Sequence, residues 1–196
     1  MKIPGASLVL VGAVCFASAC RGRDATTPAS TASASAAAPV PTIERELETF
    51  RSGMAVHPRT LAGAPSRDSL LRLFETALAR RDTIGLDQLQ ITREEFAYLY
   101  YPESKMARPP YELGPELMWL QIRSQRDRGL HRLAAKLGGT RLRIRGLECQ
   151  PPERENAVVV HQCAARTNGT GIPRQLFGSI IERDDRFKFV GFANRL

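Results

Sequence analysis

The sequence predicts an α+β protein whose helices come first and whose four-stranded antiparallel sheet follows them. Two observations support this fold class. Before Gly139, apolar side chains recur at helical spacing, and after it they alternate with polar side chains at every second position. When residues 1–41 are set aside, about 155 residues remain, enough for a single domain with one core over residues 42–196.

Residues 1–19 have the three parts of a secretory signal peptide. Met1 and Lys2 supply a positive start, an apolar stretch follows over residues 8–16, and three small residues follow at 17–19. The apolar stretch is much shorter than the roughly 20 residues that cross a bilayer. We therefore expect an exported protein whose signal peptide is removed.

Ser18, Ala19 and Cys20 resemble the lipobox of bacterial lipoproteins. This resemblance implies that Cys20 receives lipid and becomes the mature amino terminus. Arg21, in place of Asp, implies an outer-membrane lipoprotein of the cell envelope that faces the periplasm. Ala17 departs from the pattern, because an aliphatic residue is usual there, and Ala17-x-Ala19 also suits ordinary signal peptidase. The alternative is therefore a free secreted or periplasmic protein.

Residues 20–41 read as the lipidated cysteine followed by a disordered tether. The stretch after Cys20 consists almost entirely of Ala, Ser, Thr and Pro, a composition too poor in large apolar groups to repay ordering. About 20 extended residues reach roughly 70 Å. The first expected partner is thus the membrane, through the N-terminal lipid.

Cysteine usage predicts one disulfide. Of the four cysteines, Cys15 leaves with the signal peptide and Cys20 is taken by lipid, so Cys149 and Cys163 remain as a pair in an oxidising compartment. Closing a loop of about 15 residues contributes roughly 3 kcal/mol to stability. The alternative is a metal site that joins the two thiols to His161, but other ligands at suitable spacing are lacking. We expect no metal and no cofactor.

Capping signals place four helices in order. Thr42 caps a helix over residues 43–51, and Pro65-Ser66 begin a second over 67–81 with the apolar stripe Leu70, Leu71, Phe74, Ala77 and Leu78. Thr92 and Glu95 form a capping box that predicts a helix over 93–101, although residues 96–101 are also strand-prone. Pro115 suits the start of a long helix ending near Leu137 at Gly138-Gly139, with Gly129 as a candidate break.

The strands follow from the twofold alternation. Arg141, Arg143 and Arg145 alternate with two aliphatic residues, which predicts a strand with one basic and one apolar face. Residues 157–166 form the next strand, after a turn-rich stretch. Residues 176–183 and 186–194 then form a hairpin about Asp184-Asp185.

Residues 66–196 resemble the nuclear transport factor 2-like, or cystatin-like, fold. The resemblance rests on helices that feed an antiparallel sheet and on an aromatic last strand, Arg186-Phe-Lys-Phe-Val-Gly-Phe192. It implies a curved sheet that wraps the helices into a cone, with a pocket for a small ligand or a filled interior. Some relatives are isomerases or dehydratases that use an Asp and a His inside the cone, but these positions have no residue-by-residue match here.

Aromatic side chains and one histidine are the candidate pocket residues: Tyr98, Tyr101, Trp119 and His161. The alternative for the aromatic residues is ordinary core packing, and for His161 a satisfied structural role. As a general base, His161 would need a carboxylate partner among Glu94, Glu95, Glu116 and Glu148, and the spacing does not choose one. No catalytic residue is assigned.

The chain carries 28 Lys and Arg against 20 Asp and Glu, a net charge of +8. This excess suits anionic lipid heads, lipopolysaccharide or an acidic partner, and the export signal argues against nucleic acid. We expect an envelope-anchored, non-enzymatic module that binds a small ligand or an envelope protein. The alternative is a small isomerase, dehydratase or hydrolase that uses a cone-shaped pocket.

Overall fold

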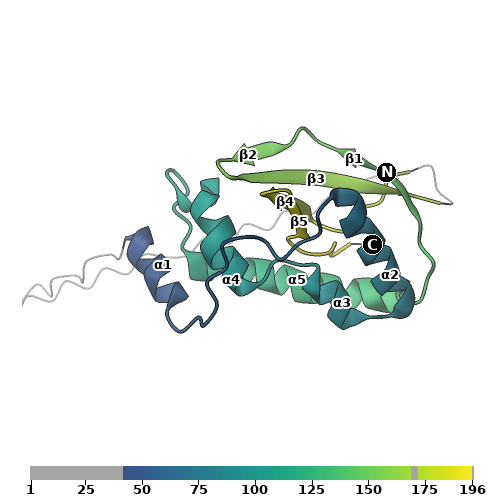
Figure 1. Ribbon diagram of the computed structural model, residues 1–196, viewed down its shortest axis with the longest axis horizontal. Coiled ribbons are helices and arrows are strands. Elements are labelled where there is room, and N and C mark those ends of the chain that lie inside the picture. Colours follow the sequence, from purple (N-terminus) through teal and green to yellow (C-terminus); the bar gives the residue numbers. More distant parts are fainter. Residues whose placement is uncertain (1–41, 169–171, 196) are drawn as a thin grey trace, which may run out of the picture. The chain divides into compact units, whose positions relative to one another are not determined.

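The computed structural model of the protein describes residues 42–168 and 172–195, which belong to one compact unit. The predictions for the signal peptide, the tether and Cys20 lie outside these residues. The described part contains five α-helices and an open five-stranded antiparallel sheet, which confirms the α+β class (Figure 1). None of its helices is long and apolar enough to cross a membrane.

The α-helices are α1 (Ile43–Arg51), α2 (Arg67–Arg80), α3 (Thr83–Gln88), α4 (Arg93–Glu95) and α5 (Pro115–Leu137). Short turns of other helical types follow α4: η1 (Phe96–Tyr100), η2 (Tyr101–Glu103) and η3 (Lys105–Ala107). The predicted first, second and last helices are confirmed to within one residue at each end.

Side-chain caps explain where these helices begin. The hydroxyl of Thr42 accepts a hydrogen bond from the Arg45 N–H, and that of Ser66 accepts one from the Ser69 N–H. Thr92 and Glu95 form both hydrogen bonds of the capping box, at 3.2 and 2.9 Å. Each cap satisfies backbone N–H groups that have no partner within the helix.

Three helix predictions need correction. The helix predicted over 93–101 is α-helical only to Glu95 and continues as the π-helical turn η1. Helix α3 was not predicted, because its six residues are too few for a clear apolar period. Gly129 does not break α5: a Cβ there would lie 2.3 Å from the carbonyl oxygen of Phe192, so this glycine serves close packing.

The sheet has five strands, where four were predicted: β1 (Ile144–Cys149), β2 (Glu153–Glu155), β3 (Val158–Thr167), β4 (Ser179–Arg183) and β5 (Arg186–Phe189). Strands β1 and β2 pair with successive parts of β3, along the edge opposite β4. Pro151 and Pro152, which have no N–H to donate, lie between these two short strands. The remaining order, β3-β4-β5, is the expected meander.

The predicted first strand, 141–145, also needs correction, because pairing begins only at Ile144. The predicted alternation of side chains nevertheless holds. Arg141, Arg143 and Arg145 are exposed, whereas Leu142 and Ile144 are partly buried against the core. The last two strands are shorter than predicted, but backbone hydrogen bonds continue beyond them between residues 176–179 and 190–193.

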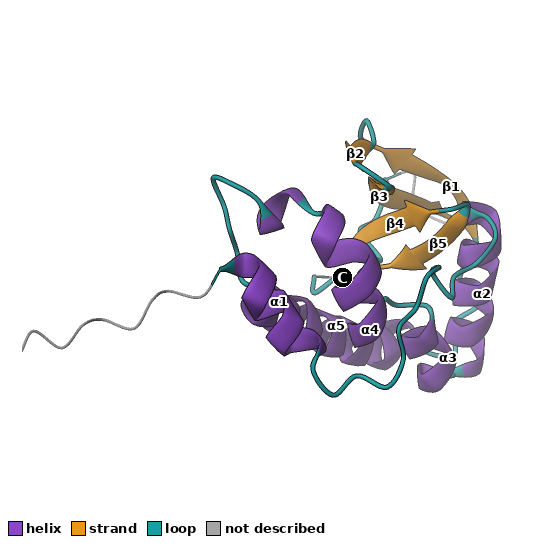
Figure 2. Cartoon of the chain, turned by 60° about the vertical axis from the view of Figure 1, so that its left-hand side comes forward, coloured by secondary structure: helices purple, strands orange, loops and turns teal. Residues whose placement is uncertain are grey.

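Both faces of the sheet are buried, and the strand register shows which residues belong to which face. Ile180 lies opposite Phe189, and both belong to a cluster that we call the first core. Ile181 lies opposite Val160, and both belong to a second core on the other face. Figure 2 shows α2 and α4 on either side of β4 and β5.

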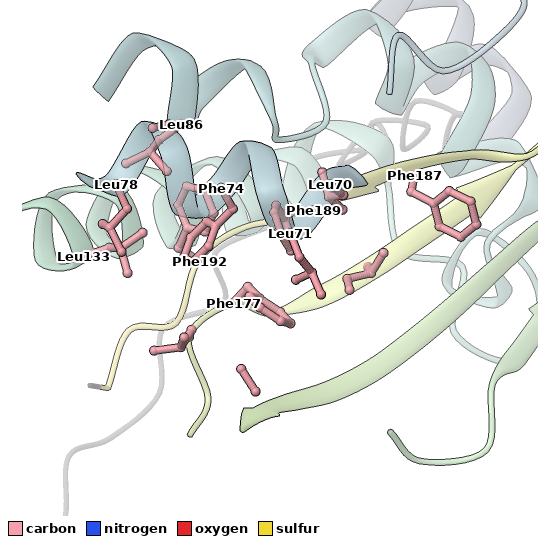
Figure 3. Packing of buried hydrophobic residues seen from close by; sticks show 14 of the residues in the cluster. Leu70, Leu71, Phe74, Leu78, Leu86, Leu133, Phe177, Phe187, Phe189 and Phe192 are labelled. Carbon is pink, nitrogen blue, oxygen red and sulfur yellow. The ribbon is translucent and has the colours of Figure 1, made fainter. Parts of the chain in front are cut away.

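The first core lies between α2, α3, the carboxyl-terminal part of α5 and the sheet. Phe74 of α2 is fully buried and meets the rings of Phe177, Phe189 and Phe192, with centroids 5.6–6.0 Å away (Figure 3). Leu133 of α5 belongs to the same cluster.

The second core lies between α1, α4, η1 and the amino-terminal part of α5. Phe96 is fully buried, with its ring 5.2 Å from that of Trp119 and 5.7 Å from that of Phe50. Because Trp119 belongs to this core and Leu133 to the first, α5 connects the two cores.

The disulfide joins Cys149 to Cys163, as predicted. The two residues lie directly opposite each other on β1 and β3, with Cα atoms 4.0 Å apart. The bond thus fastens the edge strand to the centre of the sheet.

The outer edge of β5 is closed by two other segments. Phe187 exchanges backbone hydrogen bonds with Ala64, and Phe189 donates to the Leu89 carbonyl and accepts from the Ile91 N–H. The two segments approach β5 from the start of α2 and from the end of α3. Ala64 and Leu89 of these segments also line a groove beside β5.

Candidate functional site

The four candidate pocket residues occupy two different places. Tyr98, Tyr101 and Trp119 belong to or pack against the second core, whereas His161 lies on the opposite face of the sheet. Tyr101 is fully buried and donates its hydroxyl to the Leu113 carbonyl at 2.8 Å. The structure therefore brings the three aromatic residues together but not the histidine. None of the four lines the grooves described in this section.

Burial raises the pKa of Tyr100 to about 12, and the carboxylates of Glu155 and Glu153 add to the increase. Burial likewise raises the pKa of Tyr101 to about 12, with a smaller effect from Glu46. A raised phenol pKa means that the neutral form persists at all physiological pH values. These hydroxyls can donate hydrogen bonds there but cannot act as anionic bases.

The π-helical turn η1 directs its carbonyl groups at two arginines from elsewhere in the fold. Arg51 of α1 donates two hydrogen bonds to the Ala97 carbonyl, at 3.1 and 2.7 Å, and its guanidinium lies over the Tyr98 ring at 4.5 Å. Arg183 of β4 donates to the Leu99 carbonyl at 2.7 Å. Both arginines therefore have a structural role, because they donate to carbonyls that the irregular helix leaves without a backbone donor.

His161 is paired with a carboxylate that sequence spacing did not indicate. Its Nε2 lies 2.7 Å from an oxygen of Glu182, and its side chain is only 9% exposed. Glu182 comes from the neighbouring strand, so the pair became visible only with the β3–β4 register. None of the grooves described here includes His161 or Glu182, so a substrate in them would not meet this pair.

Glu95 and Lys188 form a second buried pair, on the other face of the sheet. The Lys188 ammonium donates to Glu95 at 2.8 Å, and the two side chains are 3% and 4% exposed. The same carboxylate accepts from the backbone N–H groups of Ala62 and Thr92. Glu95 was a candidate partner of His161. Its hydrogen bonds instead connect α4 with β5 and with the segment before α2.

An open groove of about 480 Å³ lies between α2, α3 and β5. We call it the α2–α3 groove. Each helix supplies one face at helical spacing, and the segment 62–65 with Phe187 forms the floor. Its lining residues are Ala62, Gly63, Ala64, Pro65, Leu70, Leu73, Thr76, Ala77, Arg80, Asp82, Gly85, Gln88, Leu89, Phe187 and Lys188.

The α2–α3 groove is lined mainly by apolar and small residues, with Arg80 and Asp82 among its polar residues. Leu73 is 49% exposed and supplies an apolar side chain to this groove. Arg80 and Asp82 lie where α2 turns into α3, and Asp82 already accepts a hydrogen bond from the Gly85 N–H at 2.8 Å. In the sequence, Leu73 is an apolar residue that lies beside the stripe facing the core. It is the one signal that could have indicated this groove.

The chemistry of the α2–α3 groove favours binding. Its lining residues include no histidine or cysteine, its one carboxylate caps α3, and its one hydroxyl, on Thr76, donates to the Arg72 carbonyl. Nucleophilic or acid–base catalysis needs a nucleophile and a base within hydrogen-bond reach of each other. The groove lining offers no such pair.

Charged residues form a larger share of the lining in two further grooves. One is lined by three carboxylates and three cations between η2, η3 and β2, and the other lies between α1, α4 and the start of α5. Within residues 42–168 and 172–195, no three His, Cys, Asp or Glu side chains are grouped so that they could hold a metal ion.

Comparisons with protein-family models, with curated proteins and with solved structures gave no match to this chain.

Proposed function

We propose that this protein is an envelope-anchored binding module that holds the apolar part of a small ligand, or of a partner's side chain, in the α2–α3 groove. The observation that carries the proposal is the groove itself: exposed Leu73 beside small residues, with Arg80 and Asp82 at one end. An apolar cavity with a few convergent polar groups is the usual form of a ligand site. A ligand with an apolar body and one anionic group fits best, since Asp82 already has a hydrogen-bond donor whereas Arg80 has no described ion-pair partner.

The nuclear transport factor 2-like arrangement belongs to the same proposal. Helices followed by an antiparallel meander support it. An enzymatic role, as isomerase, dehydratase or hydrolase, would need a substrate to reach His161 and Glu182, and the α2–α3 groove does not lead to them.

Binding in the α2–α3 groove can be tested with 4-fluorophenylacetate, an aromatic carboxylate of suitable size. We expect its ¹⁹F resonance to broaden in the presence of the full-length protein in neutral nanodiscs. Leu73→Glu should weaken binding about tenfold, because it replaces apolar contact area with a charge that repels the probe. The measurement is a ¹⁹F NMR titration.

The matched control is Leu120→Glu, since Leu120 is similarly exposed, at 58%, but lies on α5 away from the groove. It should bind the probe like the unchanged protein. An equal loss of probe affinity in both variants would contradict a site in this groove. So would a ¹⁹F resonance that the unchanged protein does not broaden.

The envelope anchor rests on residues outside the described part and has its own test. Intact-mass spectrometry of the mature protein should find Cys20 at the amino terminus with several acyl chains, since one chain alone binds a membrane only marginally. Cys20→Ala should release the protein from the membrane fraction. A mature chain with an unmodified Cys20 would contradict the anchor while leaving the groove proposal intact.

A further inference from the structure

Four arginines lie together at the end of the molecule where α2 and α5 finish, and we call them the basic surface: Arg81, Arg141, Arg143 and Arg145. All four are exposed. None forms an ion pair with another described residue, although Arg126, Arg166 and Arg183 elsewhere each have a carboxylate partner. The nearby carboxylates of Glu75 and Asp82 accept hydrogen bonds from backbone N–H groups and form no ion pair with these arginines.

The backbone that carries the basic surface is held in place by specific contacts. The Gly139 N–H donates to the Leu78 carbonyl at 2.8 Å, which ties the end of α5 to the end of α2. Asn168 binds both backbone groups of Arg143, at 3.1 Å each. Glu75 accepts from the Ile144 N–H. The arginines therefore project from a fixed extended segment, and binding would not have to order it.

Arg81 occupies a conformation that usually belongs to glycine. It ends α2 with a φ of 58°, in the left-handed region that disfavours most side chains. Its guanidinium packs on Gly139, where a Cβ would lie 2.7 Å from Nε. Arg81 thus places a cation beside Gly139, which precedes Arg141 by two residues.

The spacing of Arg141, Arg143 and Arg145 along the chain suits a linear polymer of anions. In extended backbone, alternate residues lie roughly 7 Å apart on the same side. Arginine presents a planar fork of donors that matches phosphate oxygens in a bidentate manner, and the basic surface contains no lysine. A flexible chain whose phosphate groups follow one another more closely than this can place one of its groups against each guanidinium.

The basic surface lies far from α1 along α5. The chain from the N-terminal segment enters at α1, which packs at the amino-terminal end of α5, whereas the basic surface follows the other end of that helix. A helix of 23 residues is about 34 Å long. Figure 1 shows α1 and α2 at opposite ends of α5.

We propose that the basic surface binds a linear phosphate-bearing polyanion. This binding is separate from the α2–α3 groove and does not depend on the function proposed for it. Because the contacts are ionic, the affinity should fall steeply with salt.

Long-chain inorganic polyphosphate is the probe, with the full-length protein in neutral detergent. We expect the triple change Arg141→Gln, Arg143→Gln and Arg145→Gln to weaken binding about twentyfold, the combined effect of three exposed ion pairs. The slope of log K against log salt should fall by about 2. Biolayer interferometry over a range of salt concentrations measures both quantities.

The matched control removes the same three charges elsewhere, at Arg45, Arg59 and Arg154, which are also exposed and lack described ion-pair partners. The control should bind polyphosphate within about twofold of the unchanged protein. Circular dichroism melting checks that both triple variants fold. A third variant with Lys at positions 141, 143 and 145 should retain most of the binding, because it keeps the charge.

Three results would overturn the proposal. If the glutamine variant and its control lost the same affinity for polyphosphate, net charge alone would determine binding. Polyglutamate bound as tightly as polyphosphate would remove the phosphate assignment. Tight binding to phosphatidylglycerol vesicles that depends on the same arginines, without binding to polyphosphate, would identify a membrane surface as the partner.

Discussion

Replacing Glu95 with alanine is expected to lower the free energy of unfolding by about 3–5 kcal/mol. The change leaves the Lys188 ammonium buried, with a side chain 3% exposed and no carboxylate beside it. It also removes the acceptor for the N–H groups of Ala62 and Thr92. Urea denaturation followed by the fluorescence of the single tryptophan, Trp119, measures the loss, since that ring is buried beside Phe96.

Glu94→Ala is the matched control, because it removes the neighbouring carboxylate, which has no hydrogen bond or ion pair in the structure. We expect it to change stability by less than about 0.5 kcal/mol. Lys188→Met should cost less than Glu95→Ala, since Glu95 would keep two backbone donors. Comparable losses for Glu94→Ala and Glu95→Ala would show that the buried pair does not stabilise the fold.

Glu95→Gln provides a second measurement if the alanine variant does not fold. The amide keeps an oxygen that can accept a backbone hydrogen bond but carries no charge. Its loss of stability should lie between those of the control and of Glu95→Ala.

Replacing Phe74 with alanine is expected to cost about 3–5 kcal/mol as well. The ring is fully buried and touches three other phenylalanine rings, so its removal leaves a cavity in the first core that the rigid sheet cannot close. Leu73→Ala, the neighbouring residue in the α2–α3 groove and 49% exposed, should cost less than about 1 kcal/mol.

The Phe74→Ala experiment also tests whether the two cores unfold together. Phe74 lies in the first core and Trp119 in the second, and α5 contributes to both. If the described residues form one cooperative unit, Trp119 fluorescence and far-ultraviolet circular dichroism should report the same shifted transition. Two separate transitions would show that the cores are independent, and that α5 does not couple them.

The two-sided sheet explains why the charged residues on its faces are paired. A sheet with one solvated face can expose charged side chains at alternate positions. Here helices cover one face, and helices together with the turn η1 cover the other. Lys188 and His161 therefore point into buried surroundings, and each is matched by a glutamate from another element. These pairs account for two titratable groups that would otherwise suggest catalysis.

Local signals in the sequence were sufficient for the starts of four helices and for the disulfide. Thr42, Ser66, Thr92 and Pro115 act on backbone groups within one helical turn, so their effect does not depend on the rest of the fold. Cys149 and Cys163 were the only pair left by elimination. The alternation of arginine with aliphatic residues at 141–145 likewise predicted which side chains are exposed, although pairing starts later.

The tertiary structure decided everything that depends on which elements meet. The β3–β4 register placed His161 beside Glu182, and the packing of α4 against β5 placed Glu95 beside Lys188, two partners 93 residues apart. The α2–α3 groove exists because two short segments close the edge of β5 and hold α2 and α3 beside it. Helix caps and strand alternation are set by neighbours in the chain, whereas ion pairs, grooves and the choice of buried face are set by contacts between distant segments, which a single sequence does not specify locally.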